Sequence, residues 1–276
     1  MRFWSYLGLL LLLLASIVVD AQAADIQARS PIDGPQIVEA NGYAFNVVVK
    51  VGDPSLPTIF LESGGGHDSS QWKDLQPRIA AETGATVIAY DRPGFGKSPL
   101  PTRAYDIVAE TDAIRAAVNS LGLGKRVLLV GHSYGGFIIQ TWAARDPYAV
   151  IGLLFLDPNT PATMLAMGAE MTPRAKANPK TPRDFAFNRM DETGNAPFVA
   201  VYAQQIPVKI PLIVVSAEVP PFRDPRQIDV FRLSHELLAK SVTNGKHVVA
   251  AGANHNLHTQ APDVIVASVK ELLTPR

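Results

Sequence analysis

The 276 residues of this chain are enough for a large core, since 47% of them are hydrophobic, and 25 Lys and Arg balance 25 Asp and Glu. This zero net charge gives no electrostatic basis for binding nucleic acid or an anionic membrane surface. The chain contains no cysteine, which excludes structural disulfides and a lipidated N-terminal cysteine. The length suits one α/β domain with an insertion.

The N-terminus has the pattern of a secretory signal peptide. Arg2 gives a basic start, residues 7–19 form an uncharged apolar run, and Ala21-Gln22-Ala23 fits a small-x-small cleavage site. We therefore expect a signal peptide over residues 1–23, export to the periplasm or secretion, and a mature chain of residues 24–276 without a stable membrane anchor. The alternative is an uncleaved anchor, for which the apolar run is short.

Turn and strand signals follow in chain order. Residues 37–45 predict a hairpin, because the Asn41-Gly42 pair tolerates the positive φ of a tight turn. Apolar runs then predict strands at 58–62, 86–90, 126–130, 150–156, 212–215 and 247–250. Helical patterns lie at 105–121, 229–241 and 262–273. This alternation predicts an α/β fold, with a mostly parallel sheet that is covered by helices on both faces.

The alternation stops between residues 158 and 209. This segment is rich in proline, phenylalanine and methionine, and it shows no clear strand. We interpret it as a helical cap inserted into the single domain 24–276. Its methionines and phenylalanines favour packing over a dedicated site, and the cap is expected to line the substrate pocket.

A candidate nucleophile lies in Gly131-His132-Ser133-Tyr134-Gly135, which matches G-x-S-x-G. An apolar strand precedes the motif, and a helical pattern at residues 137–144 follows it. In that context the serine sits on a sharp, strained turn, with its hydroxyl held above the sheet at a helix N-terminus. The alternative is a glycine-rich packing turn.

The motif resembles the nucleophile elbow of the α/β-hydrolase superfamily, and the resemblance covers nearly the whole mature chain. Residues 90–98, Tyr-Asp-Arg-Pro-Gly-Phe-Gly-Lys-Ser, are similar to the loop after the fourth strand of many members. The resemblance implies an α/β-hydrolase fold and a serine hydrolase. A phosphate-binding loop at residues 94–98 is disfavoured, because Asp91 stands where that loop needs glycine.

Acyl transfer also needs two donors for the developing oxyanion. The resemblance assigns one to the backbone N–H of Tyr134 and the other to the loop at residues 61–72. Many relatives have His-Gly in that loop, whereas this chain has Ser63-Gly64, so Gly65 is the expected second donor. Ser63 is expected to brace the loop by a local hydrogen bond, and Glu62 is unusual so near an oxyanion site.

The expected base is His255, which follows the last predicted strand, because this fold orders serine before a histidine near the C-terminus. His258 is an alternative base, and the His255–His258 pair is a weak metal-site candidate that lacks a carboxylate or third histidine. The turn geometry is expected to point His132 elsewhere. His235 and His247 are expected to face solvent.

The acid is less clear. The resemblance places it after the strand that follows the cap, where Val219 and Pro220 stand. Asp157 ends an earlier predicted strand, at a position that some α/β-hydrolases use, and we prefer it. Glu218 and Asp224 are the alternatives. The chemistry asks only for a carboxylate that orients the imidazole and stabilises its charged form.

The sequence therefore predicts an exported serine hydrolase that cleaves a carboxylic ester or similar acyl bond of a small molecule, carboxylesterase-like, without metal or organic cofactor. A cofactor-free hydrolase of C–C or lactone bonds would use the same triad. A dehalogenase or epoxide hydrolase normally needs aspartate where Ser133 stands. A non-catalytic ligand-binding protein on the same scaffold is the alternative from another class. No oligomeric state is indicated.

Overall fold

The computed structural model describes residues 31–167 and 180–274. The predicted signal peptide, residues 1–23, lies outside the described residues, so cleavage and export stay predictions. Within residues 31–167 and 180–274, no helix is both long enough and apolar enough to span a membrane.

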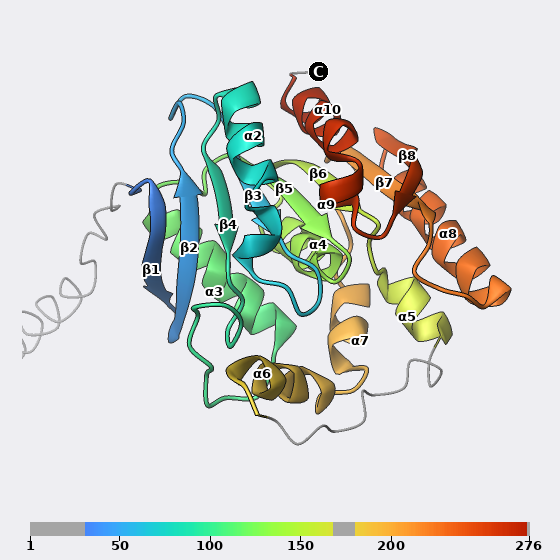
Figure 1. Cartoon of the computed structure of the whole chain (residues 1–276), viewed down its shortest axis with the longest axis horizontal. Helices are drawn as coiled ribbons and strands as arrows, with labels where there is room; N and C mark the ends of the chain where they lie inside the picture. The colour runs from blue at the N-terminus through green and yellow to red at the C-terminus, as the bar shows by residue number, and fades with distance from the viewer. Residues whose placement is uncertain (1–30, 168–179, 275–276) are drawn as a thin grey trace, which may run out of the picture.

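One sheet forms the centre of the described chain (Figure 1), with eight strands in the order β1-β2-β4-β3-β5-β6-β7-β8. They are β1 (Gly34–Ala40), β2 (Tyr43–Lys50), β3 (Thr58–Glu62), β4 (Val87–Tyr90), β5 (Val127–His132), β6 (Val150–Leu156), β7 (Leu212–Val219) and β8 (Gly245–Asn254). β2 pairs antiparallel with β1 and β4, and the pairs from β4 to β8 are parallel. This confirms the predicted fold class.

The hairpin of β1 and β2 turns at Asn41 and Gly42, whose φ angles are 50° and 75°. Positive φ at both positions is what a two-residue turn between twisted strands requires, so the Asn-Gly prediction is confirmed. β8 is longer than the predicted residues 247–250. It is an edge strand with several exposed residues, and these break the apolar run that marks a buried strand.

Helices cover both faces of the sheet, as predicted. On one face lie α3 (Ile107–Ser120), α4 (Gly135–Arg145) and α8 (Pro225–Lys240), and on the other α2 (Leu75–Thr83), α9 (Leu257–Gln260) and α10 (Pro262–Leu273). A 3-10 turn, η1 (Ser69–Trp72), leads into α2. Neighbouring strand residues alternate between the two cores: Leu129 packs with the first set of helices, and Leu128 and Val130 with the second.

Three short helices follow β6, namely α5 (Pro161–Met167), α6 (Pro182–Asp191) and α7 (Ala196–Tyr202). Figure 1 shows α6 and α7 beyond the end of the sheet at which the parallel strands finish. They contact the main domain through a buried ion pair between Arg189 and Glu110 at 2.5 Å, and through Phe198, which packs on Phe137. These helices therefore lie over the carboxyl ends of β5 and β6, where the candidate nucleophile and acid are found.

Candidate active site

Ser133 lies at the turn between β5 and α4, and its backbone is left-handed with φ of 52°. That conformation costs a non-glycine residue about 1–2 kcal/mol, so the surrounding structure must enforce it. Ser133 N–H donates to the Leu156 carbonyl at 3.0 Å, and the Ser133 carbonyl accepts from the N–H of Gly136 and of Asn159 at 3.0 and 3.1 Å. The turn is thereby fixed to the end of β6 and to the chain that follows it.

The flanking glycines of this turn are required by close contacts. A Cβ at Gly135 would lie 2.7 Å from Glu62 Cγ, and one at Gly131 would lie 2.8 Å from the Gly135 carbonyl oxygen. Both distances are too short for any side chain, so β3 and the start of α4 can approach only with glycine there. The G-x-S-x-G spacing thus reflects backbone packing around Ser133.

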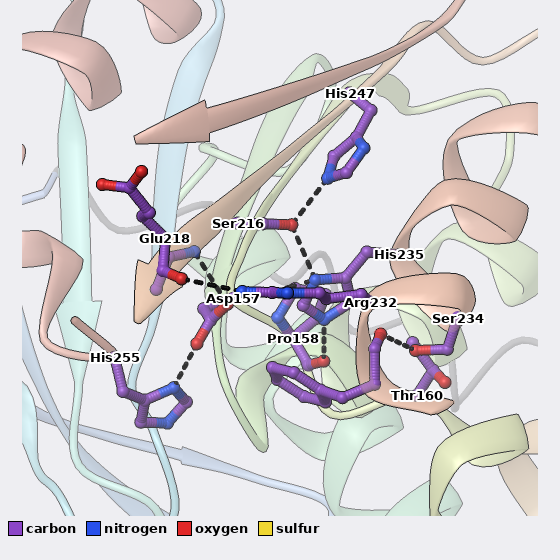
Figure 2. A network of polar contacts seen from close by, with 12 residues as sticks. Asp157, Pro158, Thr160, Ser216, Glu218, Arg232, Ser234, His235, His247 and His255 are labelled. Atoms are coloured by element: carbon purple, nitrogen blue, oxygen red, sulfur yellow. Dashed lines mark hydrogen bonds and ion pairs between the residues drawn. The ribbon is translucent and has the colours of Figure 1, made fainter. Parts of the chain in front are cut away.

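Asp157 follows β6 directly and is fully buried, with φ of 42°. One carboxylate oxygen, Oδ1, accepts a hydrogen bond from the Ala217 N–H at 2.9 Å. The other, Oδ2, accepts from His255 Nδ1 at 2.6 Å, as Figure 2 shows. A hydrogen on Nδ1 makes Nε2 the nitrogen that is basic in the neutral imidazole, which is the tautomer a triad base needs.

The alternative acids make other contacts. Glu218 Oε2 accepts from the Gly252 N–H at 2.6 Å, and Asp224 caps α8 by accepting from the Arg226 N–H at 2.8 Å. The structure therefore brings Asp157, rather than either alternative, to His255. His258 lies edge-on to Trp72, with ring centres 6.1 Å apart.

His132 connects the base to the nucleophile turn. Its Nε2 lies 2.8 Å from the carbonyl oxygen of His255, and its Nδ1 lies 3.2 Å from Nε2 of Gln71. Burial holds the pKa of His132 well below its usual value, so the ring is neutral. A carbonyl can only accept, so Nε2 carries the hydrogen and Nδ1 accepts from the Gln71 amide. The ring centre lies 4.7 Å from that of His255, so His132 contacts the candidate base itself rather than pointing away from it.

The loop after β3 holds Gly65, one of the two expected oxyanion donors, and the other, Tyr134, lies in the turn after β5. Gly65 lies against Tyr134, since a Cβ at Gly65 would stand 3.4 Å from Tyr134 Cβ. The neighbouring Gly64 N–H instead donates to Gln71 Oε1 at 3.0 Å. Ser63 Oγ donates to the Asp68 carbonyl at 2.9 Å, which is the local brace expected for it.

Glu62, unexplained from sequence, pairs with Arg92. The guanidinium of Arg92 donates from Nη1 to Glu62 Oε1 at 2.6 Å and to the Ser63 carbonyl at 2.7 Å, and from Nη2 to the Gly64 carbonyl at 2.5 Å. Both side chains are buried. Burial raises the pKa of the Glu62 carboxyl, and the adjacent guanidinium opposes that rise. Arg92 thereby holds the backbone of the loop through the carbonyls of Ser63 and Gly64.

Sequence reasoning missed two bracing residues, Arg92 and Gln71. Arg92 is in the quoted loop after β4, but nothing in the residue order links it to the carbonyls of a loop some thirty residues earlier. The prediction for His235 was wrong: this residue is fully buried, and it hydrogen-bonds the Pro158 carbonyl. Its helix packs that face against β7, so the solvent-facing expectation failed.

Comparison with known proteins places the chain in a family. Residues 59–268 match the model of the alpha/beta hydrolase family, so the chain belongs to that family. A thermophilic esterase from Thermogutta terrifontis, solved with malate bound, has a similar fold, with a TM-score of 0.61 at 18% identity over 87% of this chain and 98% of that one.

Curated relatives match over shorter stretches. Epoxide hydrolase A of Mycobacterium tuberculosis is 28% identical over 52% of this chain and 41% of its own length. The bifunctional esterase/perhydrolase DCH of Acinetobacter calcoaceticus is 29% identical over 46% of this chain and 43% of its own. The chain thus spans less than half the length of the curated relatives it matches.

Proposed function

We propose that the protein is a serine hydrolase that cleaves a carboxylic ester or similar acyl bond through Ser133, His255 and Asp157. The observation that carries this proposal is the 2.6 Å hydrogen bond from His255 Nδ1 to the buried carboxylate of Asp157, which lies at the end of the strand next to the Ser133 turn. A carboxylate that holds the imidazole by Nδ1 leaves Nε2 to act on a serine hydroxyl.

The chemistry follows in two balanced steps. Ser133 Oγ attacks the acyl carbon while its proton passes to His255 Nε2, and the resulting tetrahedral oxyanion expels the alcohol, which takes that proton. Water then attacks the acyl-enzyme, gives a proton to Nε2, and releases the acid as Ser133 Oγ regains the proton. Asp157 stays ionised and stabilises the imidazolium in both steps.

The N–H groups of Gly65 and Tyr134 are the proposed oxyanion donors. They are adjacent in the fold, and the loop that carries Gly65 is fixed by the buried guanidinium of Arg92. Donors fixed before the reaction stabilise the developing charge without reorganisation, and losing one costs about 100- to 1,000-fold in rate.

A serine at position 133 favours acyl transfer over epoxide hydrolysis, the reaction in the name of one relative. That relative matches about half of this chain, and epoxide hydrolysis on this scaffold normally uses an aspartate nucleophile where this chain has Ser133. The name of another relative includes esterase activity. The same triad could also hydrolyse C–C or lactone bonds, and the scaffold could bind a ligand without catalysis. An activity assay distinguishes these alternatives from ester hydrolysis.

The test is hydrolysis of p-nitrophenyl esters from acetate to palmitate by the purified protein, beside Ser133→Ala. We expect a preference for one chain length and loss of turnover in the variant. Turnover that survives in Ser133→Ala, or none on any ester by the wild type, contradicts ester hydrolysis at this site.

We further propose that the protein is exported and meets a small-molecule substrate outside the cytoplasm. The support is the signal-like pattern of residues 1–23. The intact mass of the protein purified from the periplasm or medium is expected to equal that of a chain that starts at residue 24. A full-length mass, in a membrane fraction, would indicate an uncleaved anchor instead.

A further inference from the structure

A second histidine network lies behind the candidate acid (Figure 2). His235, on α8, is fully buried, and its Nε2 is 2.8 Å from the carbonyl oxygen of Pro158. Its Nδ1 is 2.7 Å from Ser216 Oγ on β7, and the same hydroxyl oxygen is 2.7 Å from Nε2 of His247 on β8. One hydrogen-bonded chain therefore joins α8, β7 and β8 to the turn after β6.

The donor and acceptor of each hydrogen bond in this network follow from the chemistry of the groups. The Pro158 carbonyl only accepts, so His235 carries a hydrogen on Nε2. Burial lowers the pKa of His235 to about 4, so the ring is neutral and Nδ1 accepts the Ser216 hydroxyl hydrogen. The Ser216 oxygen in turn accepts from His247 Nε2. The Pro158 carbonyl thus fixes the tautomer of His235, and Ser216 completes it by donating to Nδ1.

The turn that His235 contacts is strained. Asp157 has φ of 42° and precedes a proline, a position that normally favours extended backbone. The Asp157 N–H donates to the Val215 carbonyl at 2.7 Å, and the Ala217 N–H holds Oδ1. His235 Nδ1 lies 4.0 Å from Oδ1, outside hydrogen-bond distance, so His235 acts on this turn through Pro158.

We propose that His235 is a positioning residue for the triad acid: its hydrogen bond to the Pro158 carbonyl, with the ring held at Nδ1 by Ser216, holds the Asp157–Pro158 turn so that Oδ2 meets His255. This inference rests on the proposed function, in which Asp157 is the acid. An apolar residue at position 235 would fill the same space but leave the Pro158 carbonyl unpaired in a buried site, and Ser216 would keep only His247 as a partner.

The test compares His235→Leu with His235→Gln, whose amide keeps a donor for Pro158. We expect His235→Leu to lower kcat by about 100-fold with KM within about twofold, as a misplaced group far from the substrate can. The acid limb of the kcat/KM profile should move to lower pH, because a displaced carboxylate stabilises the His255 imidazolium less. His235→Gln should recover most of kcat and restore the acid limb.

His67, His132 and His258 also surround His255, and they are unchanged in every variant, so the shift between profiles reports the Asp157 contact. If His235→Leu lowers only Tm, with kcat and the acid limb unmoved, the residue is structural and the proposal is wrong. If His235→Leu does not fold, Ser216→Ala breaks the same chain. It should lower kcat and move the acid limb in the same direction, and an unaltered profile overturns the proposal.

Failure of this inference and failure of the proposed function are distinguishable. The wild-type protein must first hydrolyse an ester that Ser133→Ala does not. If it does and the His235 variants behave as purely structural, only the positioning role falls. If the wild type is inactive, the proposed function falls first.

Discussion

Two non-glycine residues with left-handed backbone, Ser133 and Asp157, mark the candidate site. Such conformations persist only where surrounding contacts enforce them, and they gather at functional sites. Each lies directly after a buried parallel strand, and the Ser133 N–H bonds the last residue of β6. At the residue scale, the structure therefore concentrates backbone strain at two of the residues whose side chains the proposed mechanism uses.

Replacing Asp157 by asparagine should lower kcat by about four orders of magnitude, because an amide leaves the imidazole in the wrong tautomer and uncompensated when charged. The measurement is the ester turnover of Asp157→Asn beside Asp224→Asn, which alters only the cap of α8. Turnover within about threefold of the wild type in Asp157→Asn would show that another group is the acid.

The buried pair of Glu62 and Arg92 gives a stability prediction. Replacing Arg92 by methionine leaves the buried Glu62 carboxylate without its cation. It also removes the hydrogen bonds to the carbonyls of three loop residues, Ser63, Gly64 and His67. We therefore expect a loss of about 3–5 kcal/mol in the free energy of unfolding. Urea titration measures this. The double variant Glu62→Gln/Arg92→Met should be more stable than the single variant. Equal stabilities would mean that the Glu62 charge costs nothing there.

At the scale of elements, α6 is stabilised by its N-terminal capping box and by an ion pair to the main domain. α6 begins at a capping box in which Thr181 accepts from the Asp184 N–H and Asp184 accepts from the Thr181 N–H. From the same helix, Arg189 reaches into the main domain and pairs with Glu110 of α3. This ion pair, together with the edge-on contact of Phe187 with Phe95, holds α6 against the main domain.

Glu110 should make stability depend on pH. Burial raises its pKa from 4.5 to about 7, and Arg189 opposes that rise. Between these values the folded protein holds a proton that the unfolded chain has lost, so this group destabilises the fold as pH rises, by up to about 1.4 kcal/mol per unit. Denaturation of Glu110→Gln should therefore show a stability, relative to wild type, that increases from pH 4.5 to 7.

The matched control for this prediction is Glu236→Gln, at a half-exposed position on α8. Over the same range, the stability difference of Glu110→Gln from wild type should rise more steeply than that of this control. A flat or falling difference for Glu110→Gln would contradict a raised pKa at this carboxyl.

Strands and helices could be predicted from the sequence where the pattern of apolar residues alone determines them. The strands at residues 58–62 and 150–156 and the helix at 262–273 have the predicted bounds, because apolar runs and one-sided helical patterns follow directly from burial. α2 was not predicted, since its hydrophobic face is short. β7 runs to Val219, beyond its predicted end at residue 215, and only its last two residues are exposed.

At the scale of the whole molecule, the site depends on contacts that no local pattern shows. Asp157 could be preferred from its place at a strand end, but its meeting with His255 is set by the neighbouring parallel strands β6, β7 and β8. No sequence motif assigns a bracing role to Gln71, Arg92 or His235. Their roles arise because the sheet order brings chain segments tens of residues apart to one end, so only the assembled fold reveals them.

The proposed function requires Ser133 to be an activated nucleophile, and covalent labelling tests this without depending on the choice of ester. Native protein is treated with a fluorophosphonate, and the adduct is mapped by peptide mass spectrometry, beside Ser133→Ala and His255→Ala. We predict one stoichiometric adduct on Ser133, none in Ser133→Ala, and greatly slowed labelling in His255→Ala. An unlabelled Ser133 in folded wild-type protein would contradict the account and favour a ligand-binding role for this scaffold.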